Sequence, residues 1–215
     1  MPVPATAAEN PDPAVSAAVE RALSKRRGDA QREVEAILDA TLRVAERAAP
    51  KPPRVADIVA EAGTSNQAFY RYFSGKDEVL RAVLARGTER VHSYIAHRVA
   101  KAPGPAEQVE AWIRGVLAQV IDRTAARQSR AIVRNLGDHA AAEAGEGSLK
   151  DIRGLLRTAM RAAGSRQLEL DTNAVFDLTF AVLRRHAQAD TAPSPAECEH
   201  LVRFCLTGAG IAPQR

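Results

Sequence analysis

Apolar residues recur at intervals of three and four along most of this chain, which is the spacing of an amphipathic α-helix. The clearest stripe runs through residues 29–48 and comprises Val34, Ile37, Leu38, Thr41, Leu42 and Ala45. No segment alternates apolar and polar residues convincingly, as a half-buried strand would. The pattern therefore predicts an all-α protein of about nine helices.

Prolines, glycines and capping residues indicate where the N-terminal helices begin and end. Residues 1–11 are rich in proline and alanine without periodicity, which is typical of a disordered tail. Asp12 and Pro13 then form an N-cap with proline at the first helical position, and this extra helix is expected to continue to about Arg27. Gly28 is expected to interrupt it before the next helix.

The following segments have the pattern of helix, tight turn and short helix. Residues 55–62 carry an apolar face and end at Gly63, as helices that close on a glycine do. A short helix over SNQAFYRYF follows, and Ser74 with Asp77 forms a capping pattern for a long helix. We therefore divide the chain into a tail with an extra helix, a helix-turn-helix domain and a larger helical bundle, with boundaries at 1–28, 29–76 and 77–215.

Helical stripes continue through the bundle beyond Pro103. They cover about 106–126 and 128–143, and Ser148 with Asp151 is expected to cap another helix. The remaining stripes predict two long helices at the end of the chain.

The composition permits a folded core and limits the classes of partner. With 215 residues and 46% hydrophobic content, the chain can bury a core without disulfides. Cys198 and Cys205 lie two helical turns apart, roughly 10 Å by the helical rise, which is too far for a disulfide. We expect both to be reduced core residues. The net charge of +4 permits a polyanionic partner without requiring one.

Nothing in the sequence indicates export or membrane insertion. No apolar run approaches the roughly 18 residues that a membrane span needs. The first residues, MPVPATAAENPDP, lack the basic start and apolar centre of an export signal. We therefore expect a cytoplasmic protein without membrane contact.

Aromatic residues gather in one short stretch, AGTSNQAFYRYFSGKDEVL, in a chain with only 4% aromatic content. At helical spacing Phe69 and Phe73 share one face and are expected to pack inward. The opposite face presents small polar residues and a tyrosine, namely Ser65, Asn66, Gln67 and Tyr70. Asparagine and glutamine can bind base edges, whereas hydroxyl groups and cations contact phosphates. A short helix of this kind suits the major groove of DNA.

The segment from Val55 to Leu80 resembles the helix-turn-helix of the TetR family of one-component bacterial repressors. The family pattern is IA..AGVS...LY.HF..K..L, and this chain supplies Ile58, Val59, Ala62, Gly63, Thr64, Ser65, Phe69, Tyr70, Tyr72, Phe73, Lys76 and Leu80 in those places. The resemblance covers about residues 30–85 and implies that the second helix of the motif reads DNA. The residues implied to contact DNA are Arg54, Thr64, Ser65, Asn66, Gln67, Ala68, Tyr70, Arg71, Tyr72 and Lys76.

Two positions depart from the family pattern. Arg54 stands near the place where family members usually have a phosphate-binding threonine, and its charge suits a similar contact. Ala68 stands where a glycine or threonine is common, so that only its methyl group can approach a thymine methyl or a sugar.

Four basic residues precede this domain, namely Arg21, Lys25, Arg26 and Arg27. They can form an arm that enters a minor groove or follows phosphates. A solvated, charged helix face explains them equally well, so the sequence leaves the choice open.

By the same resemblance, residues 77–215 form a ligand-binding and dimerisation domain. The last two helices, about 172–188 and 195–208, are expected to pair with their copies through Phe176, Thr179, Phe180, Leu183, Leu201, Phe204 and Cys205. An effector pocket is expected to be lined by Val91, Ile95, Trp112, Val116, Ile132, Leu136, Leu155, Ala159, Met160 and Phe176, although each also fits an ordinary core. Such a lining favours a small apolar or aromatic effector, and no cofactor is implied.

Other chemistry has little support in the residues. Glu197 and His200 form one Glu-x-x-His pair, but a di-iron bundle needs a second pair, so no metal site is expected. No nucleophile elbow, P-loop or dinucleotide fingerprint occurs, and no enzyme is expected. The function we expect is a ligand-responsive repressor that binds a pseudo-palindromic operator as a dimer. A helical scaffold, or less readily a helical enzyme, is the alternative.

Overall fold

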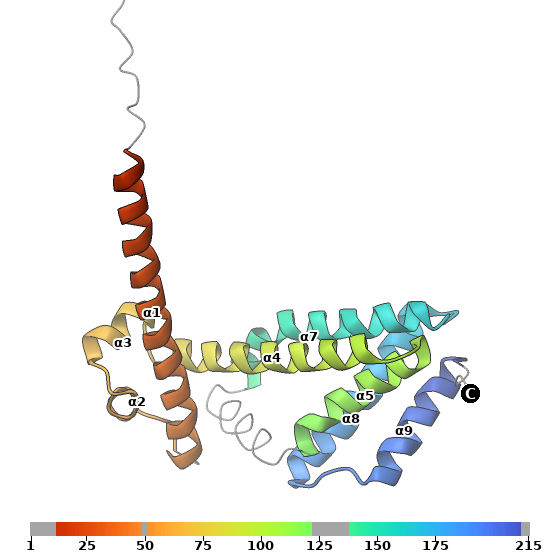
Figure 1. Ribbon diagram of the computed structural model, residues 1–215. Helices are drawn as coiled ribbons and strands as arrows, with labels where there is room; N and C mark the ends of the chain where they lie inside the picture. Colours follow the sequence, from red (N-terminus) through yellow and green to blue (C-terminus); the bar gives the residue numbers. More distant parts are fainter. Residues whose placement is uncertain (1–11, 49–50, 122–137, 212–215) are drawn as a thin grey trace, which may run out of the picture.

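A computed structural model describes the chain at residues 12–48, 51–121 and 138–211, with backbone only for 138–148. Within these ranges every regular element is a helix, which confirms the predicted all-α class. The helices are α1 (Pro13–Ala48), α2 (Val55–Ala62), α3 (Asn66–Tyr72), α4 (Lys76–Lys101), α5 (Pro105–Ile121), α7 (Asp138–Ala162), α8 (Leu168–Ala189) and α9 (Pro195–Gly208) (Figure 1). The tail predicted at 1–11 lies outside the described residues.

Helix α1 is one continuous helix of 36 residues, so the predicted interruption at Gly28 is wrong. Its start is as predicted, because the Asp12 carboxylate accepts a hydrogen bond of 2.8 Å from the Ala14 amide. A glycine inside a helix costs only about 1 kcal/mol relative to alanine, and the helix-forming residues on both sides outweigh that cost. The extra helix and the first helix of the helix-turn-helix domain are therefore a single element.

The chain folds around two hydrophobic cores. The first is formed by the second half of α1 with α2, α3 and the start of α4, and we call this unit the reading domain. Its fully buried side chains include Ile37, Ile58, Phe69 and Leu80. Figure 1 shows α2 and α3 beside α1 at one end of the molecule.

The second core lies in the bundle of α4, α5, α7, α8 and α9. Trp112 is fully buried there, and its indole N–H donates a hydrogen bond of 2.8 Å to the Ile152 carbonyl, which ties α5 to α7. Gly115 lets α4 and α5 approach closely, since a Cβ atom at that position would lie 3.1 Å from Ile95 Cγ1.

Helix α4 belongs to both cores. Val79, Leu80 and Val83 near its start pack in the reading domain, whereas Ile95 packs in the bundle. One continuous helix of 26 residues therefore joins the two units.

The bundle differs from the sequence predictions in two places. Helix α7 runs unbroken from Asp138 to Ala162, so the predicted new helix start at Ser148 is wrong, and residues 128–137 lie outside the described residues. Helix α8 begins at Leu168, a few residues earlier than predicted. The start of α9 is as predicted, with the Ser194 hydroxyl accepting the Glu197 amide at 3.1 Å. In the described ranges no helix is long and apolar enough to cross a membrane.

Candidate nucleic-acid interface

The turn between α2 and α3 is set by two residues. Gly63 closes α2 in the left-handed conformation, with φ 65°, which favours glycine because it has no Cβ atom. Ser65 then caps α3, and its hydroxyl accepts the Ala68 amide at 3.1 Å. The predicted arrangement of helix, tight turn and short helix is confirmed.

The inner face of α3 is anchored in the reading domain. Phe69 is completely buried and Phe73 is 6% exposed, and their rings lie 5.7 Å apart, so both predictions of core packing are confirmed. Ala68 is 5% exposed, which takes its methyl group away from the surface. Ala68, predicted from the sequence to contact DNA, is therefore not part of the exposed face of α3.

The outer face of α3 is open. Ser65, Asn66, Gln67, Tyr70 and Arg71 are all exposed. The Tyr70 side chain is 57% exposed, while the edge of its ring meets Phe69 at 5.3 Å between centroids. The aromatic contact orients Tyr70, and its hydroxyl group makes no hydrogen bond with the residues that the structure describes.

Glu33 of α1 joins three residues of the motif, a role that the sequence analysis missed. The Tyr72 hydroxyl donates to Glu33 Oε2 at 2.8 Å, and the Thr64 hydroxyl donates to Oε1 at 3.2 Å. Arg71 Nη1 lies 3.5 Å from the same carboxylate. Thr64 and Tyr72, both named as DNA contacts from the sequence, are thus half-buried and hold α3 against α1.

Two cations flank the motif. Arg54 is exposed at the N-cap of α2, and its side chain makes no capping bond. Lys76 is the first residue of α4, with its amine 3.9 Å from Asp77 Oδ1. Both predicted phosphate-binding residues therefore stand at the starts of the helices that precede and follow α3.

The predicted capping pair at the start of α4 needs correction. Ser74 is bonded to Glu78 rather than to Asp77, because its amide and its hydroxyl both donate to Glu78 Oε2 at 2.6 Å. These hydrogen bonds lower the pKa of the Glu78 carboxyl. The N-cap is Gly75, so α4 begins one residue after it.

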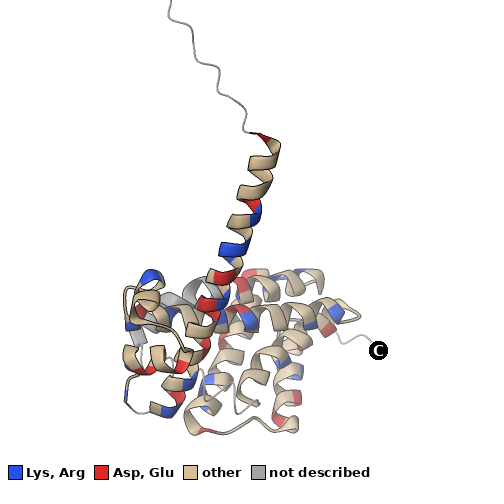
Figure 2. Cartoon of the chain, turned by 60° about the vertical axis from the view of Figure 1, so that its left-hand side comes forward, with Lys and Arg blue, Asp and Glu red and all other residues tan. Residues whose placement is uncertain are grey.

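Ion pairs fasten α2 to α1. Arg43 and Arg47 contact the two oxygens of Glu61 at 2.7 and 2.5 Å. The hydrogen bond from Arg47, followed by that from Arg43, lowers the pKa of the Glu61 carboxyl. The charges of α1 and the reading domain appear in Figure 2, where basic residues also mark the projecting part of α1.

The residues predicted to line an effector pocket are packed in the bundle core. Ile95, Trp112, Val116, Ala159 and Met160 are buried there, and Val91, Leu155 and Phe176 pack against them. Ile132 and Leu136 lie outside the described residues.

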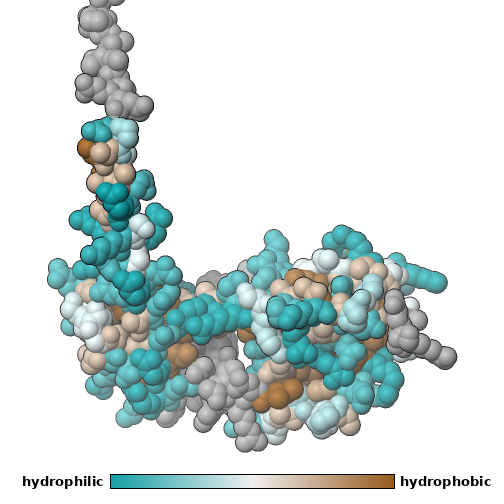
Figure 3. Space-filling model, in the orientation of Figure 1, coloured by the Kyte–Doolittle hydropathy of each residue, from teal (hydrophilic) through white to brown (hydrophobic). Residues whose placement is uncertain are grey.

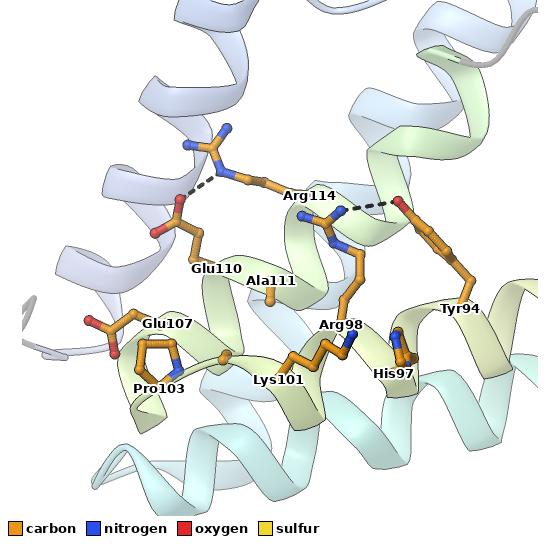
Figure 4. Close-up of a pocket in the computed structure, with 10 residues that line it drawn as sticks. Tyr94, His97, Arg98, Lys101, Pro103, Glu107, Glu110, Ala111 and Arg114 are labelled. Carbon is orange, nitrogen blue, oxygen red and sulfur yellow. Dashed lines mark hydrogen bonds and ion pairs between the residues drawn. The ribbon is translucent and has the colours of Figure 1, made fainter.

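A cavity of about 540 Å³ opens instead between α4 and α5 (Figure 4). Its lining is largely charged or polar, with Arg98 beside the Tyr94 hydroxyl at 3.2 Å and Arg114 paired with Glu110 at 2.6 Å. One oxygen of Glu107 is buried beside it without a hydrogen-bond partner among the described residues.

Most residues predicted for a dimer interface are already covered within one chain. Thr179, Leu201 and Cys205 are buried, and Phe176, Phe180 and Leu183 are partly buried against the bundle core. Phe204 is the exception, with 60% of its surface exposed. It borders a small apolar cavity of about 140 Å³ between α8 and α9, whose lining includes Leu178, Ala174 and Gly208.

The Glu-x-x-His pair noted in α9 has another partner. Glu197 contacts His186 Nε2 at 3.1 Å and also binds Arg185, so its carboxylate joins α9 to α8. Among the side chains that the structure describes, no three His, Cys, Asp or Glu residues are grouped so as to hold a metal ion.

Comparison with known proteins matches residues 37–83 to the family model described as bacterial regulatory proteins, tetR family. This range contains residues 37–48 of α1, all of α2 and α3, and the start of α4. A comparison with curated protein sequences finds no match.

Solved structures of regulators share the fold over most of the chain. A transcriptional regulator from Rhodococcus sp. RHA1 superposes with a TM-score of 0.65 at 21% identity, covering 84% of this chain and 99% of that one. A TetR-like transcriptional regulator from the same organism gives 0.62 at 21% identity, with 83% and 96% covered. The fatty acid degradation regulator FadR from Bacillus halodurans gives 0.64 at 18% identity, with 81% and 94% covered.

Proposed function

We propose that this chain is a ligand-responsive transcriptional repressor that acts as a dimer. Its residues 37–83 match the model of the DNA-binding domain of the tetR family of bacterial regulatory proteins. That it is a DNA-binding transcriptional regulator follows from this domain and from the fold of its structural neighbours. The observation that carries the proposal is the two-sided character of α3. Its inner aromatic residues are buried, while its outer polar residues are exposed.

Helix α3 would enter the major groove with its exposed face. Asn66 and Gln67 carry the amide groups that can pair with base edges, adenine above all. Ser65, Tyr70, Arg71, Arg54 and Lys76 supply the hydroxyl groups and cations that bind phosphates. Thr64 and Tyr72 would act indirectly, because their hydrogen bonds to Glu33 hold α3 in position.

A dimer would present two copies of α3 to successive turns of a pseudo-palindromic operator, about 34 Å apart or more. We place the interface on α8 and α9, at the exposed ring of Phe204 and the apolar cavity beside it. Leu170 at the start of α8 is 66% exposed and adds apolar area nearby. A two-fold interface of this kind buries the same patch on both subunits.

Effector binding in the bundle would act through α4. A ligand that prefers one position of α4 shifts the population toward one separation of the two reading domains and weakens operator binding by its differential affinity. Support comes from the shared membership of α4 in both cores. An apolar or aromatic effector stays a prediction from the sequence.

The decisive experiment measures binding of the purified protein to DNA from beside its own gene, by fluorescence anisotropy at several salt concentrations. Tyr70→Ala should weaken binding to every duplex, whereas Gln67→Ala should weaken it mainly on the cognate site, by about 1–3 kcal/mol. Tyr94→Ala is the matched control, because Tyr94 is an exposed tyrosine of α4, 41% accessible, in the bundle. Equal and weak binding to all DNA, unchanged by either substitution, would favour the scaffold alternative.

A further inference from the structure

The first part of α1 lies outside both hydrophobic cores, and we call residues 13–27 the N-terminal extension. All of its side chains except the half-buried Ser16 are exposed. Figure 1 shows it projecting as a straight continuation of the helix that supports α3. Fifteen helical residues reach about 22 Å at 1.5 Å per residue.

The N-terminal extension carries a surplus of positive charge. This segment contains four basic residues, Arg21, Lys25, Arg26 and Arg27, and only one acidic residue, Glu20. None of the four makes an ion pair or a side-chain hydrogen bond with any residue in the described ranges, whereas Arg32 farther along α1 pairs with Asp29 at 2.5 Å. Arg21 and Lys25 lie one turn apart on the same helix face. Arg26 and Arg27 follow at about 100° each around the helix, so the extension offers cations on more than one face to a polyanion.

The position of the extension relative to α3 is fixed. The helix continues without a break into the segment where Glu33 binds Tyr72 and Thr64 around α3. The free end of α1 and helix α9 lie at opposite corners of the molecule (Figure 1). In a dimer joined near Phe204, each extension would therefore point outward, away from the two-fold axis.

We propose that the N-terminal extension binds phosphates of the duplex just beyond the half-site read by α3, and so lengthens the DNA footprint outward. This inference rests on the proposed function. The four basic residues lie within 21–27, about 10 Å of helix at 1.5 Å per residue, which corresponds to about three base pairs at about 3.4 Å each. The contact is independent of sequence, because phosphates carry no base identity.

DNA fits this surface better than a second copy of the chain. Val15, Val19 and Leu23 form a half-exposed stripe on the extension, 55%, 49% and 50% accessible, which is the kind of stripe that pairs helices. Pairing two extensions in parallel would, however, bring their basic residues together with a single glutamate on each chain to compensate. Figure 3 shows a mostly hydrophilic surface over this part of α1, with apolar atoms near its free end.

The test compares the full-length wild type with a variant in which Arg21, Lys25, Arg26 and Arg27 are all changed to Gln, which keeps helix propensity. Anisotropy titrations from 50 to 200 mM salt would use three duplexes. One is a selected operator ending at the two half-sites, one is the same operator with ten base pairs added at each end, and one is a long duplex of mixed sequence. A control variant changes Lys150, Arg161, Arg166 and Arg184 of the bundle to Gln, which removes the same charge.

Loss of two phosphate contacts per chain removes four from a bound dimer and lowers the slope of log affinity against log salt by about 3.6. Across this fourfold salt range, wild-type affinity should therefore fall about a hundredfold more than that of the extension variant. Wild type should gain from the added flanks, whereas the extension variant should not. The bundle variant should behave as wild type does in its response to the flanks.

Three outcomes separate the possibilities. Equal salt slopes for wild type and the extension variant on every duplex would overturn the inference, even if operator binding is specific. A slope difference on mixed-sequence DNA without any operator preference would support the phosphate contact and contradict the proposed function instead. If Val19→Ser with Leu23→Ser lowers the oligomeric state in sedimentation while the charge substitutions leave the slope unchanged, the extension joins two copies of the chain and the DNA contact is wrong.

Discussion

The hydroxyl group of Tyr72 in α3 donates a hydrogen bond of 2.8 Å to the Glu33 carboxylate in α1, across 39 positions of the sequence. The same carboxylate accepts the Thr64 hydroxyl from the turn before α3. A single acid on the long first helix therefore fixes the orientation of the short helix that is proposed to read DNA.

Removing the Tyr72 hydroxyl should loosen this connection. Tyr72→Phe leaves one oxygen of Glu33 with one donor fewer and should lower the free energy of unfolding by about 1 kcal/mol. Tyr70→Phe is the matched control, because the Tyr70 ring is exposed and no hydrogen bond of its hydroxyl is found among the described residues. Urea unfolding followed by circular dichroism would compare them. A larger loss for Tyr70→Phe than for Tyr72→Phe would contradict the assignment.

Acid should weaken the attachment of α2 to α1. The hydrogen bonds from Arg47 and Arg43 lower the folded-state pKa of Glu61, so its stabilising effect is complete above the unfolded pKa of about 4.3 and is lost as pH falls through the folded pKa. Glu61→Gln should therefore have a lower Tm than wild type at pH 7, and the difference should shrink below about pH 4.

Glu46→Gln provides the control for this pH series. Glu46 lies on the same helix α1 and has no ion pair among the described residues. Thermal melts of the three proteins between pH 3 and pH 7 would decide the point. A Tm difference between wild type and Glu61→Gln that stays constant over this range would rule out the carboxylate as its cause.

The two thiols should react slowly in the folded protein. Burial raises the pKa of Cys205 to about 11 and also raises the pKa of Cys198. At pH 8 the thiolate fraction of Cys205 should fall at least about a hundredfold below that of an ordinary cysteine, and burial adds a steric barrier. A Cys198→Ser variant titrated with a thiol reagent, before and after unfolding, isolates Cys205. Fast labelling of the folded variant would show that this end of α9 opens readily.

A charge placed at Phe204 should separate the proposed dimer. Phe204 is 60% exposed beside an apolar cavity, so Phe204→Lys would put an amine at the centre of the expected interface. Analytical ultracentrifugation at micromolar concentration should then give a monomer in place of a dimer. Tyr94→Lys, at an exposed tyrosine of α4, should leave the mass unchanged. A dimer that survives Phe204→Lys would place the interface on another surface.

The sequence by itself determined the helices and the inner face of the motif. Periodic apolar residues, Gly63 and the caps at Asp12 and Ser194 act over one or two turns of chain, so local chemistry decides them. The same local reasoning failed at Gly28, where a glycine cost of about 1 kcal/mol did not stop a helix well supported on both sides.

Only the tertiary structure decided which side chains have partners. Glu33 has no local signal for its role, because Thr64 and Tyr72 reach it only after α1 and α3 pack together. Ala68 is likewise buried by the packing of α3 in the reading domain. The described apolar residues that were expected to line a pocket pack with Trp112 in the bundle core. Periodicity places a residue on a face of its helix, but the neighbour that covers or leaves open that face comes from distant parts of the chain.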